Sequence, residues 1–559
     1  MFLPTTKTEL EKLGWNQLDI IIVSGDAYID SSFDGAALIG KWLLSFGYKV
    51  GIIAQPDINS EKDITRLGEP TLFWGITSGC VDSMVANYTA TKKKRKTDDF
   101  TPGGINNRRP DRAAIVYTNL IKKYFKNTKP IILGGIEASL RRIAHYDYWD
   151  DKIRRSILFD SKADYLVYGM AEKSILQIAD NLKSSKDIKN IRGICYISNQ
   201  PVKNYIELPS FEDVANDKKK FVEMFHLFYR NNDPLTAKGI IQKHNDRYLI
   251  QNPPAHPPDT EELDKIYELD FERDVHPFYK KMGKVKALET IKFSITSHRG
   301  CFGECNFCSI TVHQGEHIIS RSEQSIIKEA ILLTSHPDFK GYIHDVGGPT
   351  ANMYGMKCKY KKHTGLCFYK NCAFPEPCAQ LDIDHEPQLR LLEKLRKLKG
   401  VKKIFISSGI RYDLIIEDKK SGDEYISVLA RHHTSGQIKV APEHSEGNVL
   451  KMMRKPSIKY LEKFRNKFQQ ESKKAGKKQY LTYYLIAAHP GCGEKEMKKL
   501  RSFIKSKLKI NPEQVQIFTP LPSTYSALMY YTETDPFTNK KIFVEKHLKN
   551  KQLQKEIII

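Results

Sequence analysis

Residues 290–308 read TIKFSITSHRGCFGECNFC, and this stretch decides the fold that the sequence predicts. Its first part is a strand-like apolar segment, and Cys301, Cys305 and Cys308 follow it in C-x3-C-x2-C spacing. Three thiolates on one short loop can hold one face of a cubane iron–sulfur cluster and leave one iron without a protein ligand. Gly300 and Gly303 would let the loop wrap closely around such a group. The alternatives are a zinc site with its fourth ligand elsewhere, or three unrelated cysteines.

Strand-like segments recur downstream of this loop, with helical patterns between them. The strand-like segments are residues 341–346, 403–408, 437–440, 481–487 and 514–518. Together with residues 290–297, this alternation predicts a partial (β/α)6 barrel of the TIM type. The chemistry of such barrels takes place at the C-terminal ends of the strands, which is where the three cysteines are expected.

The first 200 residues also alternate strand and helix signals. Their strand-like segments are residues 19–24, 48–54, 72–77, 130–133 and 165–169. The pattern predicts an α/β fold with a doubly wound parallel sheet, whose ligands would lie beyond the C-terminal strand ends. Neither G-x-G-x-x-G nor a Walker loop occurs at those ends, so a nucleotide site is not expected.

Changes of composition predict the domain boundaries. Residues 1–200 form the N-terminal Rossmann-like domain, residues 201–285 a connector, residues 286–535 the barrel and residues 536–559 a basic C-terminal tail. The connector contains the proline cluster NPPAHPP at 252–258, which cannot lie inside a helix or a central strand.

The motif C-x3-C-x-aromatic-C after the first barrel strand resembles the radical S-adenosylmethionine (radical SAM) superfamily. The resemblance implies that Cys301, Cys305 and Cys308 bind a [4Fe-4S] cluster whose open iron chelates S-adenosyl-L-methionine. An electron from the cluster would cleave the cofactor to a 5′-deoxyadenosyl radical, which would act on a substrate that the sequence does not identify. Phe307 matches the aromatic residue that packs near the adenine.

Further cofactor-binding candidates follow from the same resemblance. Gly347 and Gly348 correspond to a turn near the methionine amino group, although Pro349 stands where the superfamily has Glu. Ser407, Arg411 and Glu443 follow later strands, where contacts to the ribose and the carboxylate are usual.

At finer grain the chain resembles the YgiQ-type radical SAM proteins along nearly its whole length. The motifs that carry this resemblance are GDAYID at 25–30, GGIEASLRR at 134–142, HYDYW at 145–149, GPTANM at 348–353, FTP at 518–520 and MYYT at 529–532. The N-terminal sheet resembles the cobalamin-binding-like domain that often precedes a radical SAM barrel. The motif that ligates cobalt is Asp-x-His-x-x-Gly, and Tyr28 stands where its His would be. We therefore do not expect histidine to ligate cobalt, and we expect the domain to serve substrate binding or structure; cobalamin bound without a protein ligand is the alternative.

A second group of cysteines lies inside the predicted barrel domain. It consists of Cys358, Cys367, Cys372 and Cys378, whose spacing matches no common zinc ribbon. The alternatives are an auxiliary iron–sulfur cluster, a structural zinc ion, or free thiols. His363 and His385 are alternative ligands.

Charge and hydropathy restrict the partners. The chain of 559 residues has 89 Lys+Arg against 66 Asp+Glu and a formal net charge of +23. The excess permits RNA as a substrate or partner, and a zinc-stabilised RNA-binding protein is the alternative function. A radical SAM enzyme also needs an electron donor such as flavodoxin or ferredoxin. Without an apolar run of about 18 residues, we expect no membrane partner and a cytoplasmic location.

Overall fold

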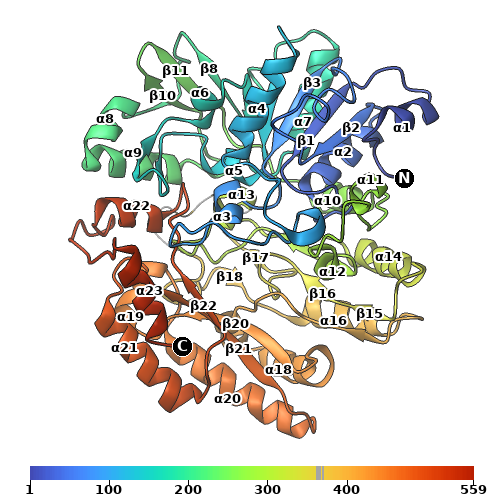
Figure 1. Cartoon of the computed structure of the whole chain (residues 1–559). Coiled ribbons are helices and arrows are strands. Elements are labelled where there is room, and N and C mark those ends of the chain that lie inside the picture. Colours follow the sequence, from blue (N-terminus) through green and yellow to red (C-terminus); the bar gives the residue numbers. More distant parts are fainter. Residues whose placement is uncertain (361–364, 366, 368–370) are drawn as a thin grey trace. The chain divides into compact units, whose positions relative to one another are not determined.

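The computed structural model describes residues 1–360, 365, 367 and 371–559, and the chain divides into two compact units. The first unit comprises Met1–Pro258 and Lys265–Lys292, and the second comprises Asp259–Asp264 and Phe293–Ile559. In Figure 1 the first unit runs from blue to green, and most of the second runs from yellow to red. Among the described residues, no helix combines the length and apolar character that crossing a bilayer requires.

A large sheet forms the centre of the first unit. In the described part of the chain it has nine strands, in the order β2-β1-β3-β4-β7-β8-β11-β10-β9. The parallel strands at one end are β2 (Val50–Ala54), β1 (Ile20–Ser24), β3 (Phe73–Thr77), β4 (Ile131–Gly134) and β7 (Tyr165–Val167). Strands β1 and β2 are buried along their whole length, as is typical of a parallel sheet covered on both faces. This part confirms the predicted doubly wound sheet.

The other end of the sheet is mostly antiparallel. It consists of β8 (Ile194–Ser198), β11 (Arg247–Gln251), β10 (Ile240–His244) and β9 (Ile206–Leu208). Strand β8 pairs antiparallel with both β7 and β11, and β10 pairs antiparallel with β11 and parallel with β9. Residues 201–285, which the sequence assigns to a connector, thus contribute strands to this sheet. The proline cluster at 252–258 follows β11 as extended chain outside any helix or strand.

Helices of the first unit pack against this sheet, and their starts are visible in the sequence. Helix α2 (Gly35–Ser45) contacts β1 and β2, and α4 (Ala113–Tyr124) contacts β3. The Asp34 carboxylate caps α2 by accepting from the backbone N–H groups of Ala36 and Ala37. Such a cap satisfies donors that the first helical turn leaves unpaired, which contributes about 1 kcal/mol.

The second unit contains parallel strand pairs that follow the order of the chain. Strand β12 (Ser294–Thr296) pairs with β16 (Asp345–Gly347), and β15 (Tyr342–Ile343) pairs with β19 (Lys403–Ile404). A parallel bridge between Ile410 and Val440 joins the segment after β19 to the next strand. The later strands are β20 (Gln437–Glu443), β21 (Tyr480–Ala487) and β22 (Gln514–Ile517), each pairing in parallel with the next.

Helices alternate with these strands along the chain. They include α14 (Glu323–Thr334), α16 (Glu386–Arg396), α18 (Gly422–Val428), α20 (Ile458–Lys474) and α21 (Glu494–Phe503). One hydrophobic core contains apolar side chains from strands and helices alike, with Ile295, Ile404 and Leu485 among its buried members. Burial of one such side chain contributes about 1.5–3 kcal/mol. The alternation confirms the predicted (β/α)6 type of fold and brings the C-terminal strand ends together.

Candidate functional site

The cysteine loop leaves the sheet of the second unit at the C-terminal end of β12. Strand β13 (His298–Arg299) pairs with β14 (Ile319–Ser320), and the loop lies between these strands together with α13 (Ile310–Gln314). Gly300 has φ of 84°, and a Cβ atom there would lie 1.9 Å from the carbonyl oxygen of His317. No other residue type fits this approach, so the glycine is required to bring Cys301 to the strand end.

The second glycine of the loop lies between two of the thiols and a cation. A Cβ atom on Gly303 would lie 3.2 Å from the sulfur of Cys301, 3.7 Å from that of Cys305 and 2.9 Å from Nη1 of Arg411. The Gly303 N–H also donates to the Cys301 sulfur at 3.3 Å. Any side chain at position 303 would therefore crowd two thiols and the Arg411 guanidinium, and we call this space around Gly303 the cradle.

The three cysteines of the loop are partly buried. Burial raises the pKa of Cys305, and it raises the pKa of Cys308 to about 12, with Cys305 and Cys301 as further causes. A bound cation would favour their thiolate form. Among the described side chains, no group of three histidine, cysteine or acidic residues is arranged to hold a single metal ion.

Residues from two later strand ends contact these thiols. The Thr350 hydroxyl, after β16, lies 3.4 Å from the sulfur of Cys301. The Arg411 guanidinium, after β19, lies 3.9 Å from the sulfur of Cys305. Arg411 is one of the candidates predicted from the sequence, whereas Thr350 is not, although it belongs to the GPTANM motif at 348–353.

The Arg411 side chain is held in a buried fork with Asp413. Its Nε donates to Oδ1 at 2.8 Å and its Nη2 to Oδ2 at 2.6 Å. The Asp413 carboxylate raises the pKa of Arg411 against the opposing effect of burial, so the guanidinium stays charged. With Nε and Nη2 engaged by Asp413, the Nη1 end of Arg411 faces Cys305.

A buried hydrogen-bond chain continues from the backbone of Arg411. Asn352 accepts from the Arg411 N–H at 2.7 Å, and its side-chain nitrogen lies 3.0 Å from Nε2 of His385. Nδ1 of His385 lies 2.7 Å from the Asp418 carboxylate. Both ring nitrogens of His385 are thus engaged, so this histidine is not available as a ligand for the second cysteine group.

The remaining cofactor candidates occupy strand ends. The carbonyl of Gly347 accepts from the Ser297 N–H at 2.7 Å, and a Cβ atom on Gly348 would lie 2.7 Å from the His298 carbonyl oxygen. The Gly-Gly turn is therefore needed for close packing on the first strand. The Ser407 hydroxyl donates to the His344 carbonyl at 2.6 Å, so its position is held by the backbone.

Glu443 stands at an irregular end of β20. The register to β21 shifts between Val440 and Glu443, and Glu443 has φ of 66°. A left-handed conformation costs a residue with a side chain about 1–2 kcal/mol. Burial raises the pKa of Glu443, while Lys455, 3.7 Å away, opposes this shift. A strained, buried carboxylate beside the cysteine loop is typical of functional sites.

Phe307 and its neighbour Asn306 attach the loop to later elements. The Phe307 ring lies edge-on to His489, with 6.3 Å between the ring centroids. The Ser526 hydroxyl, in α22 (Tyr525–Thr532), donates to Nε2 of His489 at 2.7 Å, and burial lowers the pKa of His489 to about 3. The Asn306 amide donates to the Met452 carbonyl at 2.8 Å. His489 is therefore a neutral residue that supports Phe307.

The second cysteine group lies beside the first loop. Cys372, Cys358 and Cys378 pack in the same apolar cluster as Cys301. Glu304 of the cysteine loop accepts from the backbone N–H of Cys372 at 3.3 Å. These contacts join the two groups physically. Cys367 is half-buried, and His363 lies outside the described residues.

At the C-terminal ends of β1 and β3, charged side chains of the first unit pair with one another. The Asp26 carboxylate after β1 pairs with Arg109 at 2.6 Å, and Arg109 pairs with Asp98 at 3.0 Å. A Cβ atom on Gly79, after β3, would lie 2.2 Å from the Asp26 carboxylate. All three charged side chains are buried. The Tyr28 hydroxyl donates to Asp30 at 3.0 Å, so it too is occupied. At the ends of β1 and β3 these side chains are thus engaged with one another, and Tyr28 stands where a cobalt-ligating histidine would be.

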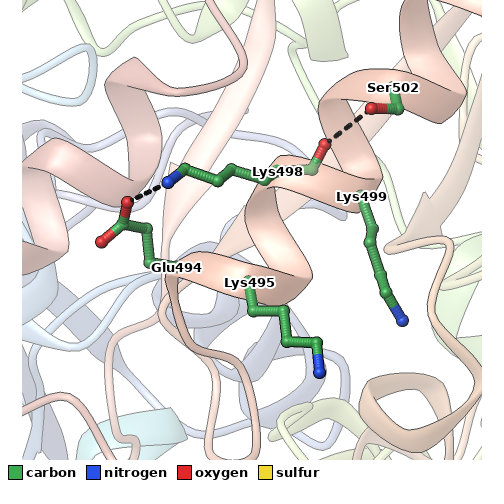
Figure 2. Close-up of a pocket in the computed structure, with 5 residues that line it drawn as sticks. All are labelled: Glu494, Lys495, Lys498, Lys499 and Ser502. Atoms are coloured by element: carbon green, nitrogen blue, oxygen red, sulfur yellow. Dashed lines mark hydrogen bonds and ion pairs between the residues drawn. The ribbon is translucent and has the colours of Figure 1, made fainter.

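A surface cavity lies on α21, on the exposed side of the second unit. Figure 2 shows its lining, and its volume is about 690 Å³. Lys498 pairs with Glu494 at 2.6 Å, and Lys499 pairs with Glu446 at 2.9 Å. The carboxylates of Glu494 and Glu446 thus offset part of the positive charge of this cavity. None of the residues predicted for the cysteine site lines it.

Comparisons with known proteins show the family of this chain. The profile of the family "Radical SAM N-terminal" matches residues 2–294. The UPF0313 protein FN0734 of Fusobacterium nucleatum is 57% identical over 558 residues, covering 100% of this chain and 98% of the relative. A UPF0313 protein of Thermotoga petrophila is 52% identical over 562 residues, covering 100% of this chain and 98% of the relative.

Two solved structures are similar in fold. The radical SAM methyltransferase TsrM from Kitasatospora setae, with cobalamin and a [4Fe-4S] cluster bound, has a TM-score of 0.54 at 12% identity; the match covers 91% of this chain and 77% of that one. The cobalamin-dependent S-adenosylmethionine radical enzyme OxsB has a TM-score of 0.51 at 12% identity; here the match covers 94% of this chain and 56% of that one. At these identities the likeness concerns the fold alone.

Proposed function

We propose, from the premise that this chain belongs to the UPF0313 family of radical SAM proteins, that it is a radical SAM enzyme. In this proposal Cys301, Cys305 and Cys308 bind a [4Fe-4S] cluster, and S-adenosyl-L-methionine binds at the iron without a cysteine. The observation that carries the proposal is the cradle around Gly303, which two thiols of the loop and the Arg411 guanidinium border.

The residues around the cradle fit such a cluster. A single zinc ion would draw its ligands to about 2.3 Å from one point, whereas a cubane needs thiolates spread around a larger body. Among the described side chains, no group of three histidine, cysteine or acidic residues converges on one point as a zinc ion would require. This arrangement supports iron–sulfur chemistry over the zinc alternative.

When bound, the cluster supplies one electron that divides S-adenosyl-L-methionine into methionine and a 5′-deoxyadenosyl radical, which abstracts hydrogen from the substrate. The chain's own residues bind and orient the cofactor. We assign the backbone of Gly347 and Gly348 and the groups at Ser407 and Glu443 to cofactor binding, and the Phe307 ring to the adenine. The neutral His489 holds that ring in place.

Cobalamin has no part in this proposal, although TsrM and OxsB bind it. The Asp26–Arg109–Asp98 network engages the charged side chains next to the end of β1, on the edge of the sheet where ligands of such folds lie. We assign a structural or substrate-binding role to this unit.

The electron donor in this proposal is a small acidic carrier such as flavodoxin or ferredoxin. The formal net charge of +23 would favour its approach over long distances. The same charge supports RNA as a substrate class, which a salt titration of RNA binding would test: affinity that falls steeply with salt supports it, and weak salt-independent binding removes it.

The test of the function is cofactor cleavage under anaerobic conditions. The wild-type protein, reconstituted with iron and sulfide, should hold about four iron atoms per cluster. Dithionite and S-adenosyl-L-methionine should then release 5′-deoxyadenosine, measured by liquid chromatography. Cys301→Ala, Cys305→Ala and Cys308→Ala should each abolish the product, while Cys80→Ala should keep it.

Unchanged product in the three loop variants would contradict the assignment. Zinc without iron in the wild-type protein, together with salt-sensitive RNA binding, would support the zinc-stabilised RNA-binding alternative instead.

A further inference from the structure

Arg411 and Asp413 form a buried ion pair that points toward the cysteine loop. Nη1 of Arg411 lies 3.9 Å from the Cys305 sulfur, while Nε and Nη2 face the two carboxylate oxygens of Asp413 at 2.8 and 2.6 Å. The positive end of the pair is thus turned to the thiol. Only 8% of the Arg411 side chain and 1% of the Asp413 side chain are exposed to solvent.

The position of this pair is held from several sides. The Arg411 N–H donates to Asn352, and Asn352 donates in turn to the Arg411 carbonyl at 3.1 Å. Nη2 of Arg411 also reaches the Ala373 carbonyl at 3.5 Å. Moving the guanidinium toward solvent would break these hydrogen bonds, so its charge stays beside the thiol.

We propose that Arg411 sets the reduction potential of the cluster, and that Asp413 limits its effect. This inference rests on the proposed function, because it needs a cluster on Cys301, Cys305 and Cys308. The reduced cluster carries one more negative charge than the oxidised one. A nearby fixed cation stabilises that extra charge, so it raises the reduction potential; a nearby carboxylate lowers it. Water is excluded from the pair, so both effects are weakly screened.

The test is a redox titration followed by electron paramagnetic resonance of the reconstituted protein. Arg411→Gln should lower the midpoint potential and decrease the ratio of reduced to oxidised cluster about tenfold at a fixed solution potential. Asp413→Asn should change the same ratio in the opposite direction, because it removes the negative charge and keeps the side-chain shape. Arg411→Lys keeps the charge and should restore part of the effect.

Loss of Arg411 leaves the Asp413 carboxylate buried without its partner. The double variant that carries both Arg411→Gln and Asp413→Asn therefore provides a second measurement. It removes both charges, and its potential should fall below that of wild type because the nearer charge was positive. Iron and sulfide are counted for every variant.

Equal midpoint potentials in wild type and all iron-loaded variants would overturn the inference about Arg411 alone. Shifts of the same sign in Arg411→Gln and Asp413→Asn would also overturn it, since a merely structural role does not distinguish the two charges. Wild-type protein without a cluster would instead contradict the proposed function.

Discussion

The hydroxyl oxygen of Thr350 lies 3.4 Å from the sulfur of Cys301, although 49 positions separate the two residues. The register of the first two parallel strands produces this contact, because Thr296 pairs with Gly347. Because β12 and β16 are parallel and in this register, both strands end at the same edge of the sheet, and the loops that follow them lie close together. The site is therefore a product of strand register.

Replacing Thr350 by Val should remove a hydrogen-bond donor to the Cys301 sulfur and keep the side-chain shape. Hydrogen bonds to cluster sulfurs raise the reduction potential, so we expect the midpoint potential of the cluster to fall. Thr350→Ser keeps the hydroxyl and serves as the control. An unchanged potential in Thr350→Val, at full iron content, would show that the hydroxyl is not directed at the cluster.

Gly303→Ala should reduce iron retention without much effect on the fold. The added Cβ atom would lie 3.2 Å from the Cys301 sulfur and 2.9 Å from Arg411, so it would narrow the cradle. Gly409→Ala is the matched control, because a Cβ atom there meets nothing within 4 Å. We expect several-fold less iron per chain in Gly303→Ala after reconstitution, by elemental analysis. Equal iron content in both variants would contradict the claim that the cluster binds next to Gly303.

The stability of the second unit should depend on Asp418 in a defined pH range. Burial opposes ionisation, but hydrogen bonds from His385 and Ser421 hold the pKa of Asp418 well below its ordinary value. A carboxyl group whose pKa is depressed in the folded state adds stability above its unfolded pKa of about 4, and this stability declines as the pH falls below that value.

Urea denaturation of wild type and Asp418→Asn checks this expectation. The difference between their free energies of unfolding should be largest near pH 7 and should shrink as the pH falls from about 5 toward 3. A difference that stays constant over this range would mean that the Asp418 charge contributes nothing.

The second cysteine group can be separated from the first by metal counting. We expect a variant with Cys358, Cys367, Cys372 and Cys378 changed to Ser to keep about four iron atoms and to cleave S-adenosyl-L-methionine, because the radical cluster uses other thiols. Additional iron in wild type that this variant loses identifies an auxiliary cluster, and lost zinc identifies a zinc site. Loss of all iron in the variant would contradict the separation.

Cobalamin should not bind to the wild-type protein. The Asp26–Arg109–Asp98 network engages the charged side chains next to the end of β1, so we expect no spectral change of hydroxocobalamin on titration with the protein. Cofactor cleavage should proceed equally with and without it. A stoichiometric spectral shift would show that the protein binds cobalamin and would contradict this prediction.

Much of the fold could be predicted from local patterns. The segment 290–297 contains β12, and the segment 19–24 contains β1, since each is a short apolar run that ends at a turn. The strands β9–β11 were missed because a polar, proline-containing region surrounds them, and their pairing with β8 joins distant segments. Such pairing depends on side-chain packing that no local pattern records.

The spacing of Cys301, Cys305 and Cys308 is a local property of the chain, because all three thiols lie on one short loop that follows a strand. The groups that face these thiols depend on the packing of distant segments. Thr350 and Arg411 reach the thiols because parallel strands end at one edge, and Arg411 turns to Cys305 because Asp413 occupies its fork. These contacts join residues far apart in the chain, so they depend on strand register and buried charge pairing rather than on local pattern.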